Sequence, residues 1–265
     1  MNVKNAIPTA DLIFISLDSL RFDTAQQLFL EGKLPNFTKW LPKSGWEERY
    51  TPASFTFPAH HAFFSGFLPT KIKQRITPRL FSAEFLGSES TTEKTFVFKE
   101  ATIVEALKNR NYKTVCIGGV GFFNKQTAIS NVFPSLFEFS EWNPSFSVTE
   151  KSSSGNQFKA AEKYLDSKES VMLFINISAT HQPTNIYLDK TKADDLASQK
   201  EALKYVDAQL EILQNALKKR KREAIIIVCS DHGTAFGEDE HFGHRNGHQV
   251  VMRVPYLELK QNYAD

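Results

Sequence analysis

The stretch that decides the fold is Ile227-Val228-Cys229-Ser230-Asp231-His232-Gly233. Its apolar part is typical of a buried strand, and the run ends abruptly at Asp231 and His232. A strand that ends in this way carries a carboxylate and an imidazole side by side at its C-terminal tip. Both groups are ligands that suit a divalent metal ion. Gly233 lets the backbone turn sharply and leaves room for a bulky group to approach.

Histidines are concentrated after this strand. Four of the seven histidines lie at positions 232, 241, 244 and 248, with glycines at 237, 243 and 247 between them. A second apolar run, residues 12–17, ends in Asp18. We expect this run to be the partner of the first stretch, so that the two carboxylates lie close together.

Length and composition limit the class of protein. The chain has 265 residues, of which 41% are hydrophobic, enough for one large α/β domain. No apolar run reaches the roughly 18–20 residues that a membrane-spanning helix needs. Residues 1–10 lack the basic start and apolar stretch of a secretion signal, so a cytoplasmic location is expected. Cys116 and Cys229 lie in apolar runs, which favours buried, reduced thiols over a disulfide.

Charge favours no particular partner, because the formal net charge is only +2. The one basic cluster, residues 218–222, closes a predicted helix, where positive charge complements the helix dipole. We interpret it as a solvated helix end in preference to a nucleic-acid patch. No nucleic-acid partner and no membrane segment are therefore expected.

Strands and helices alternate along the sequence. Periodicity predicts helices at 101–111, 158–165 and 201–219. A strand at 250–259 contains Pro255, which places it near a sheet edge. Four further apolar runs are predicted as buried parallel strands: residues 12–17, 114–118, 171–177 and 224–230. This order predicts a mostly parallel sheet covered by helices on both faces, with ligands gathering at the carboxyl ends of the strands.

We predict one domain over residues 1–265, with surface insertions near 70–100 and 122–157. Part of the second insertion, residues 133–146, is rich in Phe and contains two prolines that forbid a long helix. We interpret it as a loop-rich flap held to the core by aromatic anchors. The alternative is an apolar substrate wall or an oligomer contact.

Thr56 lies at the start of a short predicted helix, because Pro58 is acceptable in a first turn and Gly66 is a plausible stop. One interpretation is a helix-capping hydroxyl. The other is a nucleophile, which needs a metal ion or a base to lower the pKa of its hydroxyl. Free N–H groups at a helix start would favour an anionic group there, which suits phosphoryl transfer. Ser54 is the alternative nucleophile.

Asp18 and His181 each follow a predicted strand. Asp18 is either a metal ligand or a helix N-cap, and position alone does not separate the two. His181 is a proton donor to a leaving group, a ligand or a phosphate partner, or else an ordinary loop histidine. Residues 118–121, Gly-Gly-Val-Gly, are interpreted as a tight turn, because the dinucleotide motif lacks its third glycine.

Four segments together resemble the alkaline phosphatase superfamily, in particular its sulfatase-like branch and a group of short bacterial members. Residues 56–60, T-F-P-A-H, are close to the T-F-P-N-H of nucleotide pyrophosphatases. Residues 17–23 are similar to the D-D/S-L-R-x-D of sulfatase-like enzymes. Residues 230–233 look like their S-D-H-G, and residues 181–183 match H-x-P.

The resemblance implies an alkaline-phosphatase-like three-layer α/β/α sandwich. It also implies one or two divalent ions, zinc or manganese, with Asp18, Asp231 and His232 as ligands. Thr56 would be the nucleophile and His181 a second catalytic residue. A second ion or the substrate would contact three other histidines, His60, His244 and His248.

Two departures from the sulfatase pattern argue against sulfate esters. A sulfatase carries Cys or Ser at the nucleophile position, for conversion to formylglycine, and Thr56 cannot undergo that conversion. The G-K-x-H segment of sulfatases is also absent, since residues 119–121 read Gly-Val-Gly. In addition, no Asp precedes His181 at the spacing that two-zinc members use.

The resulting hypothesis is a metal-dependent hydrolase or transferase of small-molecule phosphate esters, acting through a phospho-threonine. One alternative is a sulfuric or phosphonate ester hydrolase. The other is an inactive scaffold of the same fold that binds metal or phosphate.

Overall fold

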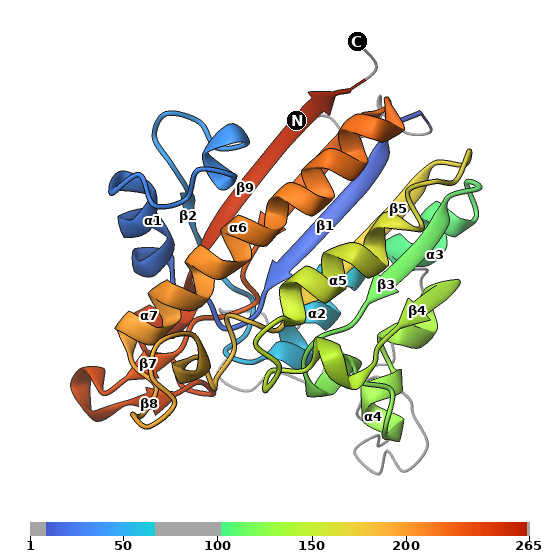
Figure 1. Cartoon of the computed structure of the whole chain (residues 1–265). Helices are drawn as coiled ribbons and strands as arrows, with labels where there is room; N and C mark the ends of the chain where they lie inside the picture. Colours follow the sequence, from blue (N-terminus) through green and yellow to red (C-terminus); the bar gives the residue numbers. More distant parts are fainter. Residues whose placement is uncertain (1–8, 67–101, 264–265) are drawn as a thin grey trace, which may run out of the picture.

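The computed structural model describes residues 9–66 and 102–263. A seven-stranded sheet forms the centre, in the order β2-β9-β6-β1-β5-β3-β4 (Figure 1). Its strands are β1 (Asp11–Leu17), β2 (Glu47–Tyr50), β3 (Lys113–Ile117), β4 (Phe139–Glu141), β5 (Val171–Ile177), β6 (Glu223–Cys229) and β9 (Arg253–Asn262). Strands β7 (Ala235–Phe236) and β8 (Phe242–Gly243) form a small separate hairpin.

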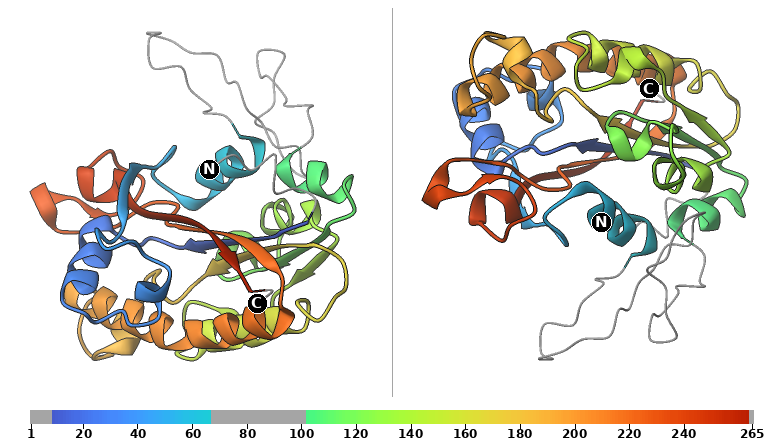
Figure 2. Two further views of the ribbon diagram at one scale, coloured as in Figure 1. Left: turned by 90° about the horizontal axis from the view of Figure 1, so that it is seen from above. Right: turned by 90° about the horizontal axis from the view of Figure 1, so that it is seen from below.

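Helices cover both faces of the sheet, as the sequence predicts (Figure 2). Helices α1, α5 and α6 lie on one face, and α2 and α3 lie on the other. The helices are α1 (Phe22–Leu30), α2 (Thr56–Ser65), α3 (Ile103–Lys108), α4 (Ala128–Asn131), α5 (Ser153–Glu162), α6 (Leu196–Arg220) and α7 (Gln249–Met252). None of the described helices is both long and apolar enough to cross a membrane.

The register of the parallel strands brings their carboxyl ends to one edge. Ser16 of β1 is level with Asn176 of β5 on one side and with Cys229 of β6 on the other. Asp18 and Asp231 each lie two residues beyond these paired positions. Two segments far apart in the sequence therefore end side by side, which is the expected location of a ligand site in such a sheet.

The predicted parallel strands are confirmed, each within one residue of its expected bounds. The strand predicted at 250–259 begins at Arg253 and runs antiparallel to β6. It is second from the edge, because the short strand β2 pairs with its outer side. Strand β2 has the sequence Glu-Glu-Arg-Tyr and is exposed throughout, so no hydrophobic pattern marks it.

Helix bounds differ more from the sequence prediction. Helix α6 begins at Leu196, several residues before the expected 201, because Asp195 caps it by accepting the N–H of Ser198. Helix α5 covers 153–162 instead of 158–165, and α3 covers only 103–108.

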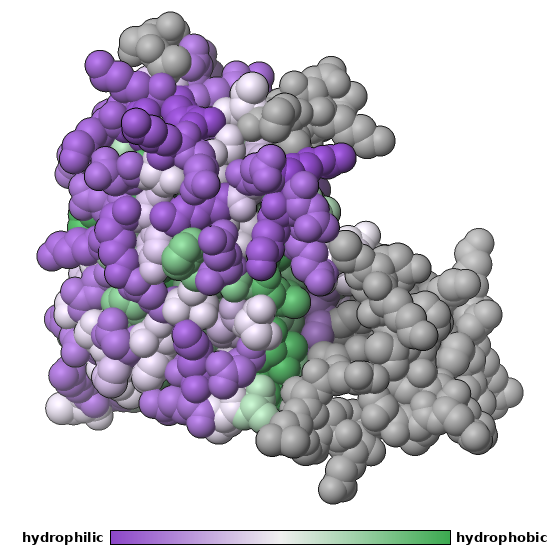
Figure 3. All heavy atoms as spheres, turned by 90° about the vertical axis from the view of Figure 1, so that its right-hand side faces the viewer, coloured by the Kyte–Doolittle hydropathy of each residue, from purple (hydrophilic) through white to green (hydrophobic). Residues whose placement is uncertain are grey.

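The insertion predicted near 70–100 lies outside the described residues. The other, near 122–157, contributes α4, the start of α5 and the edge strand β4. That edge is only three residues long, which limits pairing with other chains. Viewed from this side, the surface is mostly hydrophilic, with a small apolar area (Figure 3).

Aromatic rings fill the core between the sheet and α2. Phe64, Phe123, Phe133 and Phe174 are each at most 2% exposed and pack against one another. Burying each such side chain stabilises the fold by roughly 1.5–3 kcal/mol. Phe133 belongs to the Phe-rich segment, so at least this ring acts as the expected anchor. Both cysteines are buried and free, as expected.

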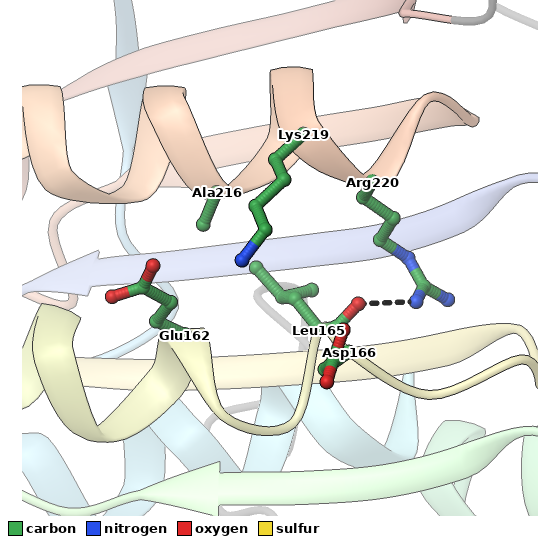
Figure 4. A pocket seen from close by; sticks show the side chains of 6 residues that line it. All are labelled: Glu162, Leu165, Asp166, Ala216, Lys219 and Arg220. Atoms are coloured by element: carbon green, nitrogen blue, oxygen red, sulfur yellow. Dashed lines mark hydrogen bonds between the residues drawn. The ribbon is translucent and has the colours of Figure 1, made fainter.

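Arg220 connects the end of α6 to the amino end of the central strand β1, far from the carboxyl ends of the strands. Its side chain is 3% exposed and forms a two-point ion pair with Asp11 of β1. It also donates to the carbonyls of Leu165 and Ser167. The basic cluster at 218–222 is thus only partly solvated. A small pocket lies beside this contact, between α5 and α6 (Figure 4).

Replacing Arg220 with Leu is expected to destabilise the fold by about 3–5 kcal/mol, because Asp11 would remain buried without its partner. Denaturant unfolding would measure the loss. Lys219→Leu is the matched control, since the exposed Lys219 lines the same pocket and carries the same charge. The control should change stability by no more than about 0.5 kcal/mol. Equal effects of the two variants would contradict this account.

Candidate metal centre

Asp18 follows β1 and is completely buried. Its Oδ2 accepts a hydrogen bond from the amide of Asn176 at 3.1 Å, and its Oδ1 accepts one from the Ser19 hydroxyl at 3.1 Å. Helix α1 begins at Phe22 with Arg21 as its N-cap, so Asp18 does not cap this helix. The capping alternative for Asp18 is therefore wrong.

Asp231 follows β6 and is also completely buried. Its Oδ1 accepts the backbone N–H of Ser19 at 3.1 Å and that of His232 at 3.0 Å. Its Oδ2 has no hydrogen-bond partner within the described ranges. A buried carboxylate oxygen without a donor is costly unless a cation binds it.

His232 presents a lone pair to both carboxylates. Its Nδ1 donates to the carbonyl of Gly233 at 2.8 Å, which leaves Nε2 as the unprotonated atom in the neutral ring. Nε2 lies 3.5 Å from Oδ2 of Asp231 and 3.9 Å from Oδ1 of Asp18. This arrangement, with one nitrogen held by a carbonyl and the other facing acidic oxygens, is typical of a metal-binding histidine.

Gly233 is required by the backbone next to this histidine. A Cβ atom at this position would lie 2.0 Å from the carbonyl oxygen of Val250. The space beside Gly233 is thus filled by the chain itself, at the segment that leads into β9. This close contact with the backbone of Val250 is sufficient to explain why position 233 is a glycine, and no bound ligand is needed to explain it.

Three ligand atoms converge at this point. One atom each from Asp18, Asp231 and His232 lie within 4.8 Å of one another. Burial raises the pKa of Asp18 to about 6, with a further contribution from Asp231, and burial likewise raises the pKa of Asp231 to about 6. Burial lowers the pKa of His232. A divalent cation would neutralise the two acids and use the free lone pairs, so these residues fit such an ion.

Thr56 lies beside these three residues and comes from a separate segment, the start of α2. It is the first residue of α2, and the preceding residue, Phe55, is the N-cap. The Thr56 side chain does not cap the helix; its Oγ1 lies 3.3 Å from Nε2 of His232. Gly66 ends the helix in a left-handed conformation, as expected. The hydroxyl therefore lies beside the three converging ligand atoms.

His60 lies next to this centre, with its Nδ1 3.7 Å from Oδ2 of Asp231, but other groups occupy its nitrogens. Its Nδ1 donates to the Thr56 carbonyl at 2.8 Å, and its Nε2 accepts from the Ser16 hydroxyl at 3.1 Å. Burial lowers its pKa to about 3, so the ring is neutral. Both nitrogens are thus occupied by the protein. The expectation that His60 serves a second ion or the substrate needs correction: the residue holds the start of α2 against β1.

His181 and His244 lie on one side of the centre. The ring of His244 is 4.6 Å from that of His232, at an interplanar angle of 33°, and 6.0 Å from that of His181. Burial, with smaller contributions from neighbouring charges, lowers the pKa of His244 to about 4. His181 follows β5, and its Nδ1 lies 2.5 Å from the carbonyl of Gln182. Both rings are partly exposed, and that of His244 packs directly against His232.

His248 belongs to a different cluster. Its Nε2 lies 3.1 Å from Oδ2 of Asp239, and its Nδ1 accepts the N–H of Val250 as the cap of α7. Its ring packs against His241, at a centroid distance of 5.2 Å. Because both nitrogens are in use, the prediction that His248 serves a second ion or the substrate is not supported by this geometry.

Two residues of the site do not emerge from the sequence reasoning. Ser19 donates to both aspartates, and Asn176 orients Asp18 while its own Oδ1 accepts the N–H of Val120. Asn176 had a detectable signal, since it is the one polar residue in the apolar run of β5. Ser19 lies in the segment 17–23 that resembles the sulfatase-like motif, but nothing in the sequence marks it as a donor to both acids.

Comparison with known proteins places this site in context. The family model described as Sulfatase matches residues 11–259. A search of curated proteins found no match. Many solved structures are similar in fold, with low sequence identity.

Three of these structures illustrate the range. The periplasmic domain of phosphoethanolamine transferase EptC from Campylobacter jejuni is 14% identical (TM-score 0.64), covering 96% of this chain and 80% of that one. The EptC domain from Escherichia coli in complex with zinc is 13% identical (TM-score 0.60; 97% and 74%). Lipoteichoic acid synthase LtaP from Listeria monocytogenes is 16% identical (TM-score 0.57; 94% and 65%). The chain therefore belongs to the sulfatase family and has the fold of the alkaline phosphatase superfamily.

Proposed function

We propose that the protein is a metal-dependent hydrolase or transferase of phosphate esters that works through a phospho-threonine. The observation that carries the proposal is the position of the Thr56 hydroxyl, whose Oγ1 lies 3.3 Å from Nε2 of His232. That nitrogen also faces two buried acids. A cation bound by these three residues would therefore lie close to the Thr56 hydroxyl. The names of the neighbours, which include phosphoethanolamine transferases, support phosphate over sulfate esters.

Asp18, Asp231 and His232 would hold the ion, which is zinc or manganese in our proposal. Its chemistry is to lower the pKa of the hydroxyl and to offset charge that grows on the phosphoryl oxygens. This group of three would hold one ion, and we propose one or two divalent ions in all. The zinc complex of a structural neighbour supports the choice of zinc.

The residues of the chain would perform the remaining steps. Thr56 loses its proton to solvent, and its Oγ1 attacks phosphorus as the bond to the leaving oxygen breaks. His181 gives a proton to that leaving oxygen, and His244 donates hydrogen bonds to the phosphate. Water or a second alcohol then attacks the phospho-threonine and restores the hydroxyl. The positive end of the α2 dipole favours the anion, although Pro58 contributes no N–H to this first turn.

Two alternatives remain in the proposal. A sulfuric or phosphonate ester hydrolase is the first, and the absence of a convertible Cys or Ser at position 56 weighs against sulfate. A scaffold without turnover is the second. The cytoplasmic location stays a prediction, because nothing in the fold tests it.

An ester panel distinguishes these functions. With zinc bound, the protein should hydrolyse an aryl phosphate mono-ester or di-ester faster than the matching aryl sulfate. Turnover would be followed by release of the coloured phenol. A faster sulfate reaction would favour the first alternative, and zinc binding with no turnover on any ester or acceptor would favour the scaffold.

Thr56→Ala should lower turnover on the best ester by on the order of a thousandfold or more, because no other group replaces the nucleophile. Zinc affinity should change little, since three ligands remain. Thr56→Ser should retain part of the activity. Ser54→Ala is the matched control and should behave like the wild type. Full activity of Thr56→Ala together with an inactive Ser54→Ala would transfer the role to Ser54.

Zinc binding should weaken as the pH falls below about 6, because protons then compete for Asp18 and Asp231, whose pKa values are raised to about 6. In the metal-free protein, the folded state binds protons at these two acids more tightly than the unfolded state does. The resulting contribution to the free energy of unfolding is fully present below pH 3.8, the ordinary pKa of an aspartate. That contribution is lost as the pH rises through about 6.

Zinc should therefore raise the unfolding temperature more at pH 7.5 than at pH 5. Calorimetry with and without zinc at both pH values measures the difference. An equal increase at the two pH values would show that the aspartates are not the ligands.

A further inference from the structure

Ser19 connects the two acids of the metal centre. Its backbone N–H donates to Oδ1 of Asp231 at 3.1 Å, and its hydroxyl donates to Oδ1 of Asp18 at 3.1 Å. Its φ angle is +62°, a left-handed backbone conformation that residues other than glycine rarely adopt. The direction of both donors depends on this unusual backbone. Something must therefore hold it.

The N–H of Leu20 donates to the Ser230 hydroxyl at 3.0 Å, and Gln199, in the first turn of α6, holds the carbonyl side of the same turn. Its Nε2 donates to the carbonyl of Ser19 at 2.9 Å. Its Oε1 accepts the hydroxyl of Thr24 from α1 at 3.2 Å. Gln199 is completely buried, and a flipped amide would put two oxygens against each other at Ser19. Both atoms of the amide thus have a defined partner and a defined direction.

We propose that Gln199 is a positioning residue for the metal centre. It does not touch the ligand atoms themselves. By holding the carbonyl of Ser19, it keeps this residue left-handed, so that the Ser19 N–H restrains Oδ1 of Asp231 and leaves Oδ2 directed at the ion. The inference rests on the proposed function, because it assumes that Asp18, Asp231 and His232 bind a cation.

Gln214 provides a matched control on the same helix. It is 2% exposed, and its Nε2 donates to the carbonyl of Asn36 at 3.0 Å. Residue type, helix, burial and the hydrogen bond from Nε2 to a backbone carbonyl are therefore the same as for Gln199, whereas Oε1 of Gln214 has no hydrogen-bond partner among the described residues. The carbonyl that Gln214 holds belongs to Asn36, the N-cap of the 3-10 helix Phe37–Lys39, whose own N–H donates to Asp207 and not to an acid of the metal centre.

The experiment compares Gln199→Leu with Gln214→Leu in the full chain. Zinc affinity would be measured by competition with a coloured chelator, and the unfolding temperature of the metal-free protein by calorimetry. Both variants should lower the unfolding temperature. Only Gln199→Leu should weaken zinc binding, by about 10–100-fold, which is the usual effect of removing a group that orients a ligand.

The isosteric variant Gln199→Glu serves if Gln199→Leu does not fold. It removes the N–H donor to Ser19 and should weaken zinc binding in the same way. Ser19→Gly supplies a second test, because glycine adopts positive φ without support. In the Ser19→Gly background, replacing Gln199 should therefore cost several-fold less affinity than in the wild type.

Wild-type zinc affinity in the Gln199 variants would overturn the inference, as would equal losses in Gln199→Leu and Gln214→Leu. Additive effects of the Ser19 and Gln199 changes would overturn it too. If the wild-type protein itself binds no divalent ion, the proposed function fails, and the positioning role fails with it. The two kinds of failure are thus told apart by the wild-type measurement.

Discussion

The rest of the site depends on the burial of two like charges at one edge of the sheet. Asp18 and Asp231 are both completely buried, and they follow β1 and β6, two strands that are paired in the sheet. Two acids in this position repel each other and lose their hydration, which destabilises the ionised pair. A cation removes both costs. The neutral His232, the unpaired carboxylate oxygen and the nearby hydroxyl all follow from this one requirement.

Much of this arrangement could be predicted from the sequence, for identifiable reasons. The strands that carry Asp18 and Asp231 are continuous apolar runs, and parallel strands must align their carboxyl ends. The location of the two acids follows from these two facts. Thr56 was predictable as a helix start, but its direction was not, because a capping hydroxyl and a nucleophile occupy the same kind of position.

The features that the sequence could not predict have a common physical origin. His60 and His248 looked like ligands because histidine is a frequent ligand, yet hydrogen bonds to Thr56 and Asp239 occupy them. Such partners come from tertiary packing, which no local pattern encodes. The same holds for Gln199, whose partner Ser19 lies far away in the sequence, and for β2, whose backbone and exposed side chains both contact β9.

Helix α6 is anchored at both ends. Gln199 holds the turn beside the acids, and Arg220 pairs with Asp11 at the amino end of β1. Each added residue would rotate one anchor by about 100° relative to the other. Exposed residues between the anchors can vary freely, whereas a one-residue insertion or deletion would misalign an anchor. The length of α6 therefore fixes the distance and the relative direction of its two contacts, so substitutions on its exposed surface are tolerated more easily than changes in its length.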